Sequence, residues 1–276
     1  TMDIDDAFHV HREKDGTFRL IVALANPAGF WPFGSALDRA VLRRGTSVYL
    51  PEATHHMLPE LFGAGCFSLK AQRILPAFFV DAIISPKGEL LQCEPRRGVV
   101  RIAANLTYEA CEAAVSEADL CVTGAAEKSE ESFSKALERT ADSKNAASIP
   151  DCPPEALNAA RPFADMLHIA EELAQALQEQ RLVHGAVIIE RPDPQVVLHG
   201  QGAEVLVDIE PGSSCPRMQL VVSEIMILAN SGMAEWAKTN SVPLLHRTQD
   251  VTVPREYSGV WSRPQDIARV VKVLSP

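Results

Sequence analysis

The sequence predicts an α+β fold in which a mixed, largely antiparallel sheet is flanked by helices. Apolar stretches rich in Val, Ile, Leu and Phe alternate along the chain with segments whose apolar residues recur every three or four positions. Consecutive strand candidates are separated by short turns containing Gly or Pro, which favours hairpins over a doubly wound parallel sheet. We interpret residues 1–276 as a single domain.

The expected strands are short, apolar and bounded by turn residues. They cover residues 17–25, 47–50, 77–84, 99–104, 186–190 and 203–209. Asp15-Gly16 before the first strand and Pro86-Lys87-Gly88 after the third are typical of hairpin turns.

Helices are expected over residues 36–44, 108–117, 155–180 and 217–239. Ser35 is the expected N-cap of the first helix and Gly45 its end, and Thr107 is the expected cap of the second. The third shows a clear apolar stripe at helical spacing. Residues 127–154 are polar and predict an inserted, mobile segment between the second and third helices.

Composition excludes some classes of protein and leaves others open. The chain of 276 residues is 46% hydrophobic and 22% charged, which is typical of a globular protein with a core. No apolar run approaches the roughly 20 residues of a membrane helix, and the acidic start is unlike a signal peptide, so we expect a cytoplasmic protein without a membrane partner. The cysteines lack zinc-site spacing.

The net charge of −10 at first argues against a nucleic-acid binder, because phosphate contacts need Lys and Arg. A magnesium site must, however, be locally acidic, and separate basic domains can hold a polymer. Charge alone therefore does not decide whether the protein binds nucleic acid.

An acidic cluster, Asp3-Ile4-Asp5-Asp6, opens the chain. On an extended backbone Asp3 and Asp5 point to one side and Asp6 to the other, so all three meet one ion only if the segment turns. Such carboxylates suit Mg²⁺, which takes a few of them and fills its shell with water and phosphate oxygens. The tetrapeptide by itself favours a solvated acidic segment, because short acidic runs are common.

The surrounding motifs are more specific, and they occur in a fixed order. They are DIDDAF, LIVALANP, GSALDRAVLRRGTSVYLP, HMLPEL, FSL, NLTYEA and VVSEIMILAN. In this order they resemble the ribonuclease II (RNB) family over about residues 2–232. The resemblance implies an RNB catalytic-domain fold, incomplete in this chain and truncated at both ends.

Carried over position by position, the resemblance implies roles for seven residues. Asp3, Asp5 and Asp6 fall on the family's catalytic aspartates, which hold Mg²⁺ and position the attacking water. Tyr49 falls on an aromatic that stacks on an RNA base, and Tyr108 on a tyrosine near the 3′-terminal nucleotide. Ser223 falls on a glutamate linked to recognition of the terminal ribose and Glu224 on the glutamate after it, and both are expected to bind substrate. Without the motifs, both tyrosines would be interpreted as packing residues.

Departures from the family pattern concern how RNA is held. Ser223 replaces a usual Glu, which puts the discrimination of RNA from DNA in doubt. Asn26, Leu75 and Ile188 stand where the family often has Asp, Arg and an aromatic. The family has a further aspartate before Asp3 and a late arginine block, and neither occurs in this sequence. We therefore expect the sequence to be part of a longer chain that also carries accessory RNA-binding domains. Because the arginine block is absent, we expect little activity from this piece alone.

Other polar groups leave alternatives open. His55-His56 could suggest a metal pair but lack a third ligand, and His9 and His11 could touch phosphate or be merely solvated. The pairs Arg43-Arg44 and Arg96-Arg97 are equally compatible with RNA contacts and with surface charge.

The resemblance to the RNB family implies a Mg²⁺-dependent hydrolytic 3′→5′ exoribonuclease that acts on single-stranded RNA and releases nucleoside 5′-monophosphates. The alternative is a catalytically inactive RNA-binding or regulatory protein that retains the RNB fold.

Overall fold

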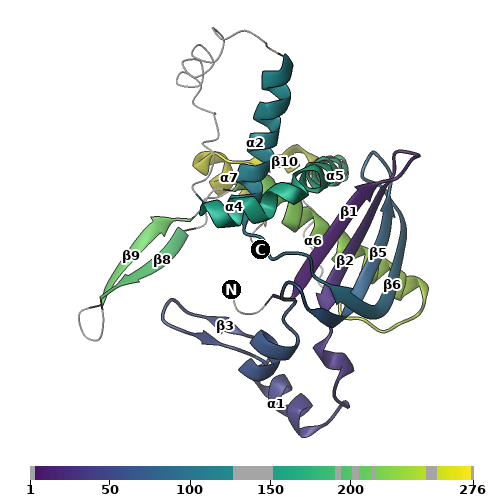
Figure 1. Cartoon of the computed structure of the whole chain (residues 1–276), viewed down its shortest axis with the longest axis vertical. Helices are drawn as coiled ribbons and strands as arrows, with labels where there is room; N and C mark the ends of the chain where they lie inside the picture. The colour runs from purple at the N-terminus through teal and green to yellow at the C-terminus, as the bar shows by residue number, and fades with distance from the viewer. Residues whose placement is uncertain are drawn as a thin grey trace.

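A computed structural model describes residues 4–126, 152–189, 194–200, 205–212, 215–246 and 254–274. Its centre is a four-stranded antiparallel sheet in the order β1-β2-β5-β6, with helices across one face (Figure 1). The predicted α+β class and largely antiparallel sheet are confirmed; a short parallel pair, β7 with β10, makes the strand pairing mixed.

The sheet strands are β1 (Asp6–Arg12), β2 (Phe18–Ala25), β5 (Ile74–Ile84) and β6 (Leu90–Arg101). In β2, Phe18, Leu20 and Val22 alternate toward the helices and are almost completely buried. Our sequence prediction missed β1 and placed β6 too late, at residues 99–104. The first half of β6 is polar and exposed, so the apolar pattern that marks a strand is absent there.

The principal helices are α2 (Tyr108–Ala126), α5 (Ala164–Val183) and α6 (Pro216–Thr239). Buried side chains recur along α5 and α6 at three- and four-residue spacing and join the sheet in one core. The predicted helix over 155–180 is in fact two helices, because Pro162 lies in a 3₁₀ turn (η3, Arg161–Phe163) between α4 (Pro154–Ala160) and α5.

Close backbone approaches fix the sheet against these helices. Gly88, in the β5–β6 turn, has φ +82, and a Cβ there would lie 2.4 Å from the carbonyl oxygen of Ala176 in α5. A Cβ on Gly232 of α6 would lie 2.8 Å from Sγ of Cys93 in β6. The helices therefore sit directly on the sheet.

A separate lobe follows β2. It contains η1 (Pro27–Gly29), α1 (Ala36–Arg44), the hairpin β3 (Val48–Tyr49) with β4 (Thr54–His55), and η2 (Leu61–Cys66). The predicted bounds of α1 are confirmed, since Ser35 Oγ accepts from the Asp38 amide at 3.2 Å and Gly45 ends the helix at φ +74.

The rest of the chain is more open. The hairpin of β8 (Pro194–His199) and β9 (Leu206–Pro211) extends away from the core, while β7 (Val187–Ile189) pairs with β10 (Gly259–Trp261) (Figure 1). A 3₁₀ turn, η5 (Arg255–Tyr257), precedes β10, and α7 (Pro264–Leu274) ends the described chain. Of the polar segment predicted at 127–154, residues 127–151 lie outside the described residues. None of the described helices could cross a membrane.

Candidate active site

The acidic cluster lies at the start of β1, which is an edge strand of the sheet. Asp5 precedes the strand and its carbonyl accepts from the Ala25 amide at 2.7 Å; Asp6 is the first residue of β1 and pairs with Leu24. Both side chains are exposed. Asp3 lies outside the described residues. Consecutive residues of an extended backbone face opposite ways, so the carboxylates of Asp5 and Asp6 diverge.

A buried polar brace holds this segment. The Ile4 amide donates to Ser68 Oγ at 3.0 Å, and the Leu69 amide donates to the Ile4 carbonyl at 2.8 Å. Ser68 is completely buried, and Leu69 belongs to a small core cluster that Ile4 joins. The chain leading into the aspartates is therefore fixed from both sides of its backbone.

The brace continues to the segment that begins α2. The Asn105 side chain donates to the Leu69 carbonyl at 2.9 Å and accepts from the Ala71 amide at 2.7 Å. Three stretches distant in sequence, 4–6, 68–71 and 105–108, thus meet in one place. Our sequence analysis included Asn105 in the NLTYEA motif and Ser68 in the FSL motif but assigned neither a role at the site. The available signal was that each lies in a motif of the family, Asn105 three positions before Tyr108.

Tyr108, the first residue of α2, lies close to the aspartates. Partial burial raises the pKa of its phenol above the usual value, and the nearby Asp6 carboxylate raises it further, since a second negative charge there is unfavourable. Its side chain is 42% exposed, so the hydroxyl stays protonated at neutral pH and can still be reached from solvent.

Tyr49 lies on the β3–β4 hairpin of the lobe, where Tyr49 pairs with Thr54. It is 63% exposed, which leaves ring surface open to a stacking partner. Its predicted contact with RNA is not tested by this geometry and stays a prediction.

Ser223 and Glu224 are neighbours on α6 with opposite surroundings. Ser223 is exposed, and its hydroxyl donates to the Leu220 carbonyl at 3.0 Å. Glu224 is 2% exposed and accepts two hydrogen bonds from Arg181 of α5, at 2.9 and 2.7 Å. The predicted substrate contact of Glu224 stays a prediction, but the structure gives its carboxylate a partner that joins two helices. No local pattern pointed to Arg181, because its partner lies 43 positions away.

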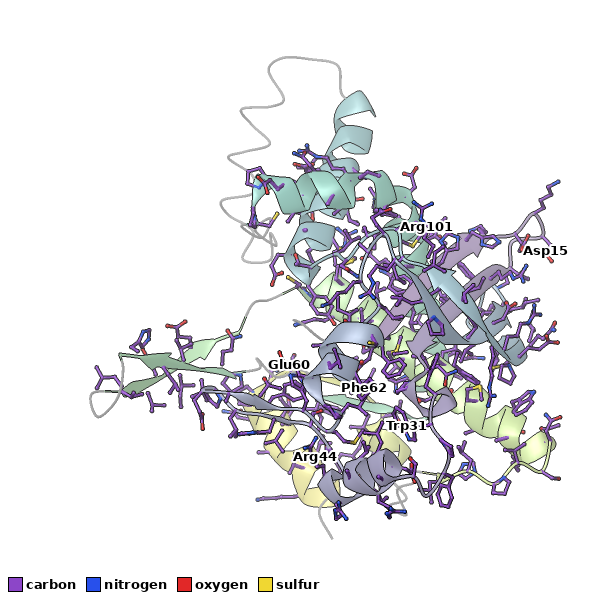
Figure 2. All side chains as sticks on the ribbon, turned by 60° about the horizontal axis from the view of Figure 1, so that its bottom comes forward. Asp15, Trp31, Arg44, Glu60, Phe62 and Arg101 are labelled. Carbon is purple, nitrogen blue, oxygen red and sulfur yellow. The ribbon has the colours of Figure 1, made fainter. Side chains whose placement is uncertain are left out.

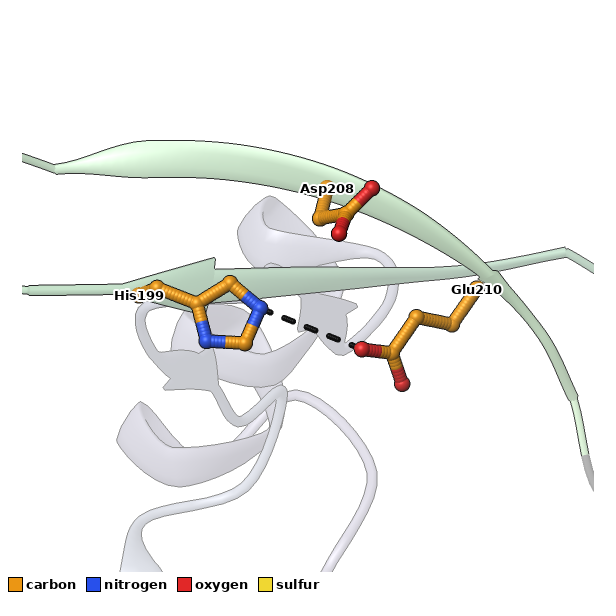
Figure 3. Close-up of side chains that lie close together, drawn as sticks. All are labelled: His199, Asp208 and Glu210. Carbon is orange, nitrogen blue, oxygen red and sulfur yellow. Dashed lines mark ion pairs between the residues drawn. The ribbon is translucent and has the colours of Figure 1, made fainter.

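One group of three potential metal ligands occurs among the described residues, and it lies elsewhere. His199, Asp208 and Glu210 share one face of the β8–β9 hairpin, with ligand atoms within 4.8 Å of one another (Figure 3). All three are exposed, and His199 Nε2 lies 3.9 Å from Glu210. Exposed carboxylates and histidines commonly gather without an ion, so the group alone does not define a metal site.

Comparison with known proteins identifies the family. The family model of the RNB domain matches residues 1–272. The chain belongs to the RNB domain family. Its relatives include ribonuclease R of Thermotoga maritima, 26% identical over 253 residues, which are 91% of this chain and 30% of the relative. Exoribonuclease 2 of Buchnera aphidicola is 40% identical over 91 residues, 33% of this chain and 14% of the relative.

Solved structures of the RNB family share the fold. Mycoplasma genitalium RNase R, solved with double-stranded RNA, matches at a TM-score of 0.60 and 19% identity, covering 88% of this chain and 36% of that one. A Candida glabrata Dss1 exoribonuclease matches at a TM-score of 0.63 and 20% identity over 87% of this chain and 29% of that one. The chain thus spans about a third of the length of the RNB proteins it matches.

Proposed function

We propose that this RNB chain is the catalytic part of a Mg²⁺-dependent hydrolytic exoribonuclease, which degrades single-stranded RNA from its 3′ end and releases nucleoside 5′-monophosphates. The observation that carries the proposal is that hydrogen bonds bring three family motifs together. Ser68 and Asn105 brace the segment that presents Asp5 and Asp6, and they do so beside Tyr108.

The donor chemistry at Asp5 and Asp6 fits a magnesium ion. Both residues offer carboxylate oxygens at an exposed position, and Mg²⁺ needs one or two such oxygens while it keeps several waters. Because Asp5 and Asp6 diverge, we assign one of them to the ion together with Asp3. When bound, the ion would acidify the attacking water and neutralise charge at the scissile phosphate.

The chain's own residues would hold the substrate. The raised pKa of Tyr108 keeps its phenol uncharged, so it can donate a hydrogen bond to a ribose or phosphate oxygen of the last nucleotide. The exposed ring of Tyr49 suits stacking on a base, which is independent of base identity. Ser223, smaller than the glutamate usual at its position, would hold the terminal ribose less tightly.

The test uses the full-length protein and oligoribonucleotides labelled at either end. With Mg²⁺, we expect the 3′ label to leave at once as a mononucleotide and the 5′ label to appear in progressively shorter products. Asp5→Asn should abolish release, whereas Asp165→Asn, an equally exposed carboxylate at the start of α5, should not. A chelator should stop the reaction and added Mg²⁺ restore it. Binding without release by the unaltered protein would instead support the inactive RNA-binding alternative.

A further inference from the structure

The lobe after β2 exposes aromatic rings beside arginines. Phe33 is 97% exposed and Phe30 is 56% exposed. The helix α1 that follows them presents Arg39, Arg43 and Arg44, all exposed. We name these five residues the aromatic–arginine surface. Exposed rings in such number are unusual on a surface that contacts only water.

The exposed rings rest on a fixed base. The ring centroids of Phe30 and Phe67 are 5.1 Å apart, and Phe67 is itself buried and contacts the rings of Trp31 and Phe62 at 6.2 and 6.0 Å. Figure 2 shows Trp31, Phe62 and Arg44 gathered in this lobe, well away from Asp15. Because Phe67 and its neighbours hold Phe30, less conformational entropy is lost when a ligand stacks there.

The arginines of α1 outnumber its acidic residues by three to one. The carboxylate of Asp38, the one acidic residue of α1, is engaged by the Trp31 indole at 3.4 Å and the Gly34 amide at 2.9 Å. Within the part of the chain that the structure describes, none of the three arginines of this surface forms an ion pair. Arg39 and Arg44 donate instead to the carbonyls of Gly34 and Met57. A chain of net charge −10 thus carries a cationic patch here.

The surface continues toward the hairpin that carries Tyr49. Arg44 lines a cavity of about 480 Å³ whose other walls come from β3, β4 and the segment after them, including His55, His56 and Glu60. Tyr49 is on β3 itself. Arg44 of α1 therefore lies against the hairpin that carries the predicted stacking tyrosine.

We propose that the aromatic–arginine surface binds single-stranded RNA upstream of the cleaved end, with Phe33 and Phe30 stacking on bases and the arginines contacting phosphates. This inference rests on the proposed function for the identity of its ligand. Exposed rings followed by an arginine-rich helix suit a strand of any sequence, because every base has a π-face and every linkage a negative charge. A protein partner would need the apolar rings but not the three arginines that follow them.

Binding of a fluorescent oligoribonucleotide, followed by anisotropy, tests the inference in the full-length Asp5→Asn protein, in which the RNA stays intact. Phe33→Ala should weaken binding by roughly fivefold or more, the loss of one stacked base. Phe33→Leu should weaken binding similarly, because it loses the π-face although it keeps apolar bulk. Phe33→Trp should keep the affinity, because it keeps a ring. Phe33 is exposed, so none of these substitutions should unfold the protein, and circular dichroism with thermal melting checks that each variant is folded.

Charge is tested by salt dependence. Arg43→Ala should reduce the slope of log affinity against log salt by about 0.7, the value for one phosphate contact on a single strand. Lys14→Ala is the matched control, since this exposed cation lies in the β1–β2 turn, beside Asp15 (Figure 2). It should leave the slope unchanged.

The outcomes separate this inference from the proposed function. Unchanged affinity in Phe33→Ala and Arg43→Ala would overturn the surface even if the unaltered protein hydrolyses RNA. Full affinity in Phe33→Leu would also overturn it, because it would show apolar docking rather than stacking. Weakened binding in the variants, with no hydrolysis by the unaltered protein, would support the surface and reject only the proposed activity.

Discussion

At the scale of single residues, Asp6 and Tyr108 are electrostatically coupled across two motifs that lie about a hundred positions apart in the sequence. The phenol of Tyr108 therefore reports on the charge of Asp6, because that charge opposes ionisation of the phenol.

This coupling gives the first prediction. Asp6→Asn should lower the pKa of Tyr108 toward its ordinary value of 10.0, since the desolvation that raises it remains but the neighbouring charge is gone. Absorbance of tyrosinate during a pH titration measures the change. The chain has three tyrosines, so the signal of Tyr108 is obtained by difference from Tyr108→Phe. An unchanged Tyr108 pKa in Asp6→Asn would contradict the proximity of the two groups.

Ser223 and Glu224 were given a shared role from their motif, but their surroundings in the structure differ. The family pattern predicts that both contact the substrate. In the structure Glu224 is buried in a two-pronged pair with Arg181, whereas Ser223 faces solvent. Adjacent positions on a helix lie about 100° apart, so their surroundings differ even when a motif groups them.

At the scale of elements, the Arg181–Glu224 pair joins α5 to α6. Glu224→Gln should lower the free energy of unfolding by about 1 to 2 kcal/mol, because it leaves the Arg181 guanidinium without its counter-charge, while the 35% exposure of Arg181 lets solvent offset part of the loss. Urea denaturation measures the loss, and Ser223→Ala should show almost none. The double variant Arg181→Met with Glu224→Met should recover part of the stability. A stable Glu224→Gln protein with weakened RNA affinity would instead favour the substrate contact.

A second electrostatic link joins neighbouring strands on the sheet face away from the helices. Asp81 of β5 accepts from Arg19 of β2 at 3.1 and 3.0 Å, and Arg96 of β6 lies 3.5 Å away. The hydrogen bonds from Arg19 hold the pKa of Asp81 below its ordinary value of 3.8, although partial burial opposes the shift.

The sign of this shift predicts a pH dependence. A carboxyl whose pKa is lower in the folded protein contributes stability above its unfolded pKa and loses it as pH falls through the folded value. Asp81→Asn should therefore cost about 1 kcal/mol at neutral pH and less at about pH 2, since Arg19 is partly exposed. Urea midpoints measured across this range should converge for the two proteins. If the difference between the two urea midpoints stayed the same at every pH, the protonation of Asp81 would make no contribution to the stability.

At the scale of the whole molecule, burial is uneven. One core unites β1, β2 and β5 with α2, α5 and α6, and its central residues are fully buried. The lobe is different: α1 has no buried residue, and both residues of β3 and of β4 are exposed. Residues 36–55 of the lobe, which carry Tyr49 and the arginines, are thus held by few apolar contacts, in contrast to the ring cluster around Phe67.

Amide hydrogen exchange should show this difference. We expect amides of residues 36–55 to exchange about two orders of magnitude faster than those in the middle of β2 and β5, because opening the lobe exposes little apolar surface. Addition of single-stranded RNA to the Asp5→Asn protein should slow exchange in the lobe. Equal protection in lobe and sheet would contradict a weakly packed lobe.

Local patterns in the sequence determined several elements of this protein by themselves. Ser35 and Gly45 fixed both ends of α1, since a side-chain cap and a left-handed residue act within one turn. The β-branched run of β2 and the helical spacing of α6 were equally local, and the ordered motifs predicted the RNB family. Pro162 is a local signal too, which our sequence prediction did not use.

Tertiary structure alone decided the contacts that join distant segments. The N-terminus of α6 has no cap of its own: Cys215 offers no side-chain bond, and Glu112 of α2 accepts from the Met218 amide at 3.1 Å instead. In the same way Ser68 and Asn105 fix the position of Asp5 and Asp6. No spacing rule reaches across such distances in sequence, because these partners are set by how helices and strands pack and not by the neighbouring residues.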